Sequence, residues 1–193
     1  HFGSLGTTGG PVSMLNNNLL TNSDFMTGAF PAEYGNAVAG AFDLNLRSGN
    51  NQQREYTGQI GFNGFEAGAE GPFSKNGKAS YLANYRYSTL AAFHAMGFGT
   101  GTGAAVPYYQ DLTFNVDVPG TKAGRFKLFG LGGLSHIELG QDPEADENSN
   151  SYNARGTATD YGSDLGVMGL SHLYFFNKNT RVKSTFSVQG TRN

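Results

Sequence analysis

Residues 24–49 read DFMTGAFPAEYGNAVAGAFDLNLRSG, two short extended segments separated by turn residues. The first, Asp24 to Thr27, is half apolar and is followed directly by a glycine. Between the two segments, Pro31 fixes φ and Gly35 tolerates positive φ, which favours a tight turn. The second, Ala41 to Arg47, alternates apolar and polar side chains with the period of a half-buried strand. We therefore predict two short strands joined through a turn.

This stretch resembles the end of the plug domain of TonB-dependent outer-membrane receptors, which runs directly into the first barrel strand. Arg47-Ser48 stands where the family pattern has Thr-Lys, and the residues on other pattern positions are Gly28, Tyr34, Gly35 and Gly40. The form GAFPAEYGNA is similar to the branch that carries a carboxypeptidase-regulatory-like extension, akin to SusC-type receptors. The chain departs from the pattern at Thr27, Ala41 and Leu44, where arginine, glycine and asparagine are usual. Because Thr27 is uncharged, it cannot supply the cation of the plug-to-barrel ion pair expected in other branches.

The resemblance implies an all-β protein with two parts. Residues 1–50 would be the end of a plug domain, and residues 51–193 about seven antiparallel strands of a large, incomplete transmembrane β-barrel. It further implies active uptake of a ligand (a siderophore, glycan or peptide) across the bacterial outer membrane, driven by the TonB–ExbB–ExbD complex. The partners are then outer-membrane lipid, that complex, the unknown transported ligand and, as a candidate, a SusD-like surface lipoprotein. Neither enzymatic activity nor a cofactor is expected.

The composition suits a β-protein whose strands face something other than water. There are 29 Gly, 15 Phe and 10 Tyr, but only 15% of the residues are charged. The net charge of −2 gives no general attraction to nucleic acid, and the lack of cysteine excludes disulfides. No apolar run approaches the ~18 residues of a membrane helix, whereas a membrane strand needs only about 9–11 alternating residues.

Alternation after Arg54 predicts seven strands, at about 56–62, 65–73, 80–88, 111–118, 125–139, 164–176 and 182–189. In the third, Leu82 falls among the polar side chains. In the fifth, the pattern slips near Gly132-Gly133, where we expect a bulge. One short helix is expected around Met14–Leu20.

The connections alternate in length. A tight Asn63-Gly64 turn comes first; the others, short and long in turn, are Ser74–Gly77, His94–Tyr109, Pro119–Gly124, Gln141–Gly162 and Asn177–Thr180. Outer-membrane barrels place short turns on the periplasmic side and long loops outside, and this order fits if the first strand runs outward. Tyr85 and Tyr87 then lie near the outer end of their strand, and Phe73, Phe175 and Phe176 near the inner ends, as aromatic girdles would.

Seven strands are too few to close around a plug, since large plugged transporters have about 22. Open edges in lipid would leave backbone groups unpaired. We therefore expect an internal fragment, with further strands after Asn193, or one part of a larger assembly.

Candidate site residues fall into two groups. Ligand-binding candidates lie in the expected plug and long loops: Phe30, Tyr34, His94, Tyr108 and Tyr109. Glu66 and Glu70 share one strand face, which we take to be the inner one. They are either solvated lumen carboxylates, the default, or partners of plug cations such as Arg47 in a plug–barrel contact.

Metal and catalytic signals are weak. None of the four histidines has metal-ligand spacing with another His, Cys or carboxylate. Asp142, Glu144 and Asp146 place carboxylates at alternate positions that could hold Ca²⁺, but the turn glycine of a calcium loop is missing, so a solvated loop is the default. Gly97–Gly103 is glycine-rich without the strand and helix context of a phosphate loop.

Two other classes of function remain open. A non-transporting outer-membrane barrel could act as an adhesin or as a docking platform for a surface lipoprotein. Alternating strands are also typical of a soluble β-sandwich, as in a secreted carbohydrate-active enzyme. No convincing pair of catalytic carboxylates supports that last class.

Overall fold

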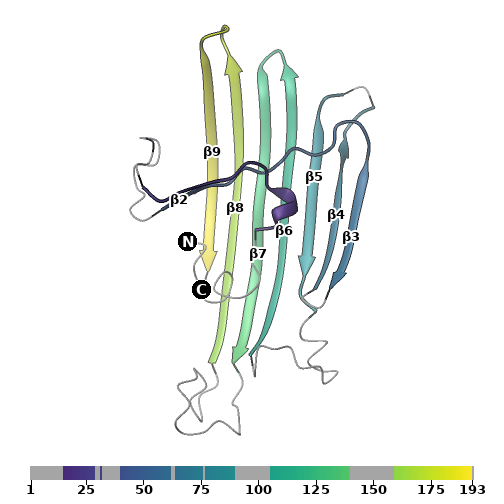
Figure 1. Ribbon diagram of the computed structural model, residues 1–193, viewed down its shortest axis with the longest axis vertical. Helices are drawn as coiled ribbons and strands as arrows, with labels where there is room; N and C mark the ends of the chain where they lie inside the picture. The colour runs from purple at the N-terminus through teal and green to yellow at the C-terminus, as the bar shows by residue number, and fades with distance from the viewer. Residues whose placement is uncertain are drawn as a thin grey trace, which may run out of the picture.

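A computed structural model describes residues 15–28, 31, 40–61, 64–75, 77–89, 105–139 and 159–192. The fold is all-β, as predicted, apart from a one-turn 3₁₀ helix η1 (Asn17–Leu19). The strands form a two-stranded sheet and a seven-stranded antiparallel sheet, and the N-terminal part of the chain crosses one face of the larger sheet (Figure 1). In the part of the chain that the structure describes, no helix is long and apolar enough to cross a membrane.

The small sheet pairs β1 (Asp24–Met26) with β2 (Ala41–Asp43), so that Phe25 lies opposite Phe42. The predicted second strand is too long, because the ladder beyond Asp43 continues only as an isolated bridge between Leu20 and Leu46. Three residues, 21–23, lie opposite two, 44–45, and this mismatch interrupts regular pairing.

The large sheet is a simple meander in which every strand pairs with its neighbours in the chain. Its members are β3 (Glu55–Gly61), β4 (Gly64–Pro72), β5 (Ser80–Tyr87), β6 (Ala105–Thr121), β7 (Gly124–Leu139), β8 (Thr159–Phe175) and β9 (Arg181–Arg192). All seven predicted strands are present. Strands β6–β8 are about twice as long as β3–β5, and they extend past them at both ends of the sheet (Figure 1).

Several predicted boundaries are wrong because backbone pairing continues where the side-chain pattern fades. The expected 94–109 loop is shorter, since β6 starts at Ala105, opposite Leu139. The expected 141–162 loop likewise ends where β8 begins, at Thr159. Within the expected 119–124 turn, β6 runs to Thr121 and only residues 122–123 form the turn. Gly64, expected in a turn, is the first residue of β4 and pairs with Gly61.

The bulge expected at Gly132-Gly133 is absent. Both glycines pair in continuous register with β6 and with β8. The pattern slips only because Phe129 and Leu131 place apolar side chains on the polar face. The irregularity lies instead between Val118 and Thr121, just before the turn. Gly124, which follows that turn, has a φ of 103°, a conformation that favours glycine.

The two faces of the large sheet differ in chemistry. We call residues 15–50 the covering segment, the face of the sheet against them the covered face, and the opposite face the open face. Buried polar residues gather on the covered face: Glu70, Ser80, Asn84, Asp111, Thr113, Asn115, Asp117, Ser135 and Ser163. Large apolar side chains are exposed on the open face, among them Tyr56, Ile60, Phe65, Leu112, Leu128, Leu134, Met168, Leu170, Phe186 and Val188. The sheet thus buries its polar side and exposes its apolar side.

Candidate functional site

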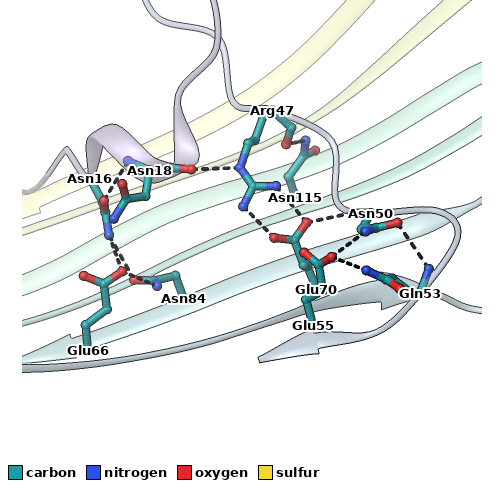
Figure 2. A network of polar contacts seen from close by, with 10 residues as sticks. All are labelled: Asn16, Asn18, Arg47, Asn50, Gln53, Glu55, Glu66, Glu70, Asn84 and Asn115. Atoms are coloured by element: carbon teal, nitrogen blue, oxygen red, sulfur yellow. Dashed lines mark hydrogen bonds and ion pairs between the residues drawn. The ribbon is translucent and has the colours of Figure 1, made fainter. Parts of the chain in front are cut away.

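The contact between residues 15–50 and the covered face is centred on Arg47. Its guanidinium binds the Glu70 carboxylate of β4 in a bidentate fork, with Nη1 2.7 Å from Oε2 and Nη2 2.6 Å from Oε1 (Figure 2). The Glu70 side chain is only 11% exposed, so the ion pair is largely shielded from water on that side. Glu70 also accepts a hydrogen bond from the Asn50 backbone amide at 2.7 Å. Of the two alternatives for Glu70, the structure therefore has the pair with Arg47.

Arg47 is held on every side. Its Nε donates to the Asn18 carbonyl at 2.8 Å, and its backbone amide donates to the Leu19 carbonyl at 2.9 Å. Its own carbonyl accepts from Asn115 Nδ2 of β6 at 2.8 Å. The hydrogen bond to Glu70 raises the pKa of Arg47 above its ordinary value, against the effect of partial burial. Arg47 thus connects η1 and the rest of the covering segment to two strands of the sheet, β4 and β6.

Glu66, four residues before Glu70 on the same face of β4, makes a different contact. Its Oε1 accepts from Asn16 Nδ2 and from Asn84 Nδ2, both at 2.8 Å (Figure 2). Its contact with residues 15–50 is therefore a hydrogen bond from the neutral amide of Asn16 to a carboxylate, and not an ion pair. Leu19 and Leu82 are both buried between the two acidic contacts and line the same small cavity of about 90 Å³. Leu82, out of place in the strand pattern, faces the covering segment.

The residue after Arg47, Ser48, makes a third contact between the covering segment and the sheet. The Ser48 hydroxyl donates to Asp117 of β6 at 2.5 Å, and Asp117 also pairs with Arg125 of β7. Gly49 then passes so close to β5 that a Cβ there would lie 2.0 Å from the Tyr81 carbonyl oxygen. Only glycine permits this approach of two backbones. Further along the covered face, Arg86 and Asp111 form a separate pair at 2.9 Å.

Tyr108 and Tyr109 were predicted to lie in a long loop, but the structure places both in β6. Adjacent strand residues point to opposite faces, so the structure does not bring their side chains together. Tyr108 lies on the open face beside His136, with ring centroids 6.1 Å apart. Tyr109 lies on the covered face, and its carbonyl accepts from the Ser88 amide.

The other predicted ligand and metal residues lie outside the described part of the chain: Phe30, Tyr34, His94, Asp142, Glu144 and Asp146. Within the described ranges, no three His, Cys, Asp or Glu side chains lie close enough together to hold a metal ion.

Sequence reasoning missed the asparagines that surround the ion pair. Asn16, Asn18, Asn50, Asn84 and Asn115 all take part in this network. The available signal was that Asn84 and Asn115 alternate with apolar side chains along their strands. Their partners come from a segment far away in the chain, and periodicity carries no information about such contacts.

Searches of protein-family models, curated proteins and solved structures found no match to this chain.

Proposed function

We propose that this chain is one wall of an outer-membrane β-barrel together with the end of its plug, in a TonB-dependent transporter that takes up a ligand across the bacterial outer membrane. The observation that carries the proposal is the inverted polarity of the sheet. A sheet folded in water hides its apolar face and exposes its polar one. Here Asp111, Asn115 and Asp117 are at most 6% exposed, whereas Met168, Phe186 and Val188 are at least 51% exposed. Such a surface suits contact with lipid.

The dimensions of the open face support a lipid-facing band. On β9, Val182 to Arg192 is ten steps of about 3.4 Å, or roughly 34 Å along the strand. A strand tilt of about 40° reduces this to a height of roughly 26 Å, near the ~25 Å band of membrane barrels. At the end of the band away from the short turns, the open face carries a row of paired residues across five strands. These residues are mostly polar or aromatic: Tyr87, Gln110, Leu134, Asp164 and Arg192.

Aromatic clusters lie at both ends of this band, as girdles would. At the short-turn end, the rings of Phe126 and His172 are stacked with their centroids 4.4 Å apart, and the ring centroids of Phe73 and Tyr81 are 5.4 Å apart. At the other end, Phe65 lies 5.8 Å from Tyr87.

The covering segment has the properties of a plug that can move. Its contacts with the sheet are mainly polar, and water can replace such contacts when a plug is displaced. In this proposal, uptake rests on differential binding of the ligand and on gating by the plug.

Lipid contact can be tested by single-cysteine spin labels at positions 185–189 of β9, because the chain contributes no cysteine of its own. In the complete polypeptide in bilayers, Phe186→Cys and Val188→Cys should collide with lipid-soluble oxygen. Thr185→Cys, Ser187→Cys and Gln189→Cys should instead be reached by a water-soluble nickel reagent. Lys178→Cys, in the exposed turn before β9, is the aqueous control. An absence of alternation along β9, or alternation with the opposite phase, would remove the barrel proposal.

Transport is distinguished from an adhesin or docking platform by TonB. The complete polypeptide, purified from outer membranes, should bind the purified periplasmic domain of TonB. A platform has no need of that contact, so a barrel that passes the spin-label test but fails to bind TonB would favour the platform.

A further inference from the structure

A groove of about 570 Å³ lies between residues 43–46 and the covered face of β6–β9. Its walls carry four cations, Arg125 and Lys127 of β7 and Arg181 and Lys183 of β9, near the short-turn end of the sheet. The covering segment crosses β7–β9 in front of this region (Figure 1). The acidic side chain that lines the groove is Asp43.

Three of the four cations are uncompensated. Arg125 is paired with Asp117, whereas Lys127, Arg181 and Lys183 form no ion pair with any described residue. Arg125 and Lys183 both pair with Leu173, which lies between them on β8. Their backbones are therefore two strand spacings apart, or about 10 Å. Lys127 and Lys183 carry like charges in the same groove, and an anion between them would reduce their repulsion.

We propose that this groove binds a small solute with several carboxylates or phosphates. The anionic groups lie against Lys127, Lys183 and Arg181. A segment of protein is the poorer occupant, because the segment that already covers the groove brings one carboxylate, Asp43, and leaves the volume open. The proposal rests on the proposed function: it makes the transported ligand anionic and places a binding step beside the movable segment.

The test is calorimetry on the complete polypeptide in detergent, with citrate as the probe in metal-free buffer. Citrate should bind saturably and more weakly as salt increases. Lys127→Gln and Lys183→Gln should each weaken binding roughly tenfold, the value of one charge-assisted hydrogen bond. Lys178→Gln removes a cation at the same end of the sheet but outside the groove, and should stay within about twofold.

Saturable citrate binding that is lost in Lys127→Gln Lys183→Gln and kept in Lys178→Gln supports the site. No saturable binding, or equal affinity in the double variant and the parent, overturns it. Absence of binding together with a lower melting temperature of the double variant also overturns it, because an acidic segment of the polypeptide would then fill the groove. The spin-label test of β9 is independent of the lysines, so failure of the anion site and failure of the barrel give different patterns of results.

Discussion

At the scale of single residues, the association of the covering segment with the sheet depends on Arg47 and Glu70. The pair combines a fork of two charge-assisted hydrogen bonds with a further amide donor from Asn50. Bidentate geometry makes such pairs stronger than point-charge contacts. Because Glu70 is nearly buried, removal of its charge leaves a guanidinium without compensation, and this is where a single substitution acts most strongly.

Glu70→Gln should therefore loosen residues 40–50 without unfolding the sheet. The loss of a charged acceptor costs about 1–3 kcal/mol, so the Arg47 backbone amide should exchange with deuterium roughly 5- to 150-fold faster. Hydrogen exchange followed by mass spectrometry of the complete polypeptide measures this. The matched control is Arg192→Gln, which breaks a pair whose arginine is 84% exposed and should change exchange little. Equal effects of the two substitutions would show that the Arg47 pair has no special role.

At the scale of elements, glycines on one strand make room for aromatic rings from the next. On the open face, the Phe114 ring of β6 lies over Gly130 of β7, its directly paired residue. On the covered face, the Phe129 ring of β7 lies over Gly169 of β8 in the same way. A ring over a glycine shields the backbone and fills the space of the missing side chain, which fixes the register of long strands.

Gly130→Ala should disturb the pairing of β6 with β7. A Cβ at this position would lie 2.3 Å from the Phe114 ring, so the ring must rotate away at a cost of about 1–3 kcal/mol. Gly166→Ala is the control, since nothing lies within 4 Å of its Cβ. Thermal unfolding of the detergent-solubilised polypeptide compares the two. Adding Phe114→Leu should recover much of the loss; a Gly130→Ala variant as stable as the control would contradict the packing argument.

At the scale of the whole molecule, the sheet separates two environments. Its covered face is polar, buried and fastened to residues 15–50, and its open face is apolar and exposed. The edge strands β3 and β9 are exposed along their whole length. This combination of a polar covered face and an apolar open face is what we expect of the barrel wall proposed above.

Insertion of a charge on the open face should therefore cost more at mid-height than at the boundary. Met168→Lys, in the row with Gly130 and Val188, should destabilise the protein in bilayers by about 2–4 kcal/mol. Leu134→Lys, in the boundary row with Gln110 and Asp164, should cost about 0–1 kcal/mol. Urea unfolding from liposomes measures both. Equal costs at the two positions would mean that no depth-dependent apolar layer contacts this face.

The sequence by itself determined the all-β class, the seven strands and which residues share a strand face. Side-chain alternation is a local property, and it is visible over most of the strands from Glu55 onward. Strand ends were less certain, as at Ala105 and Thr159, because pairing with β7 continues through segments without alternation. The Gly132-Gly133 region was misread for a related reason: two apolar side chains on the polar face imitate a change of phase.

Only the tertiary structure decided what the polar face contacts. The sequence left Glu70 either solvated or paired with Arg47, because the two are 23 residues apart and no local pattern links them. It gave no sign that Asn16 and Asn84 would meet on Glu66, or that Gly49 would lie against Tyr81. It placed Arg125 and Lys127 on one strand and Lys183 on another, with a third strand between them. Pairing through β8 brings these strands together, and with them the cations that line one groove.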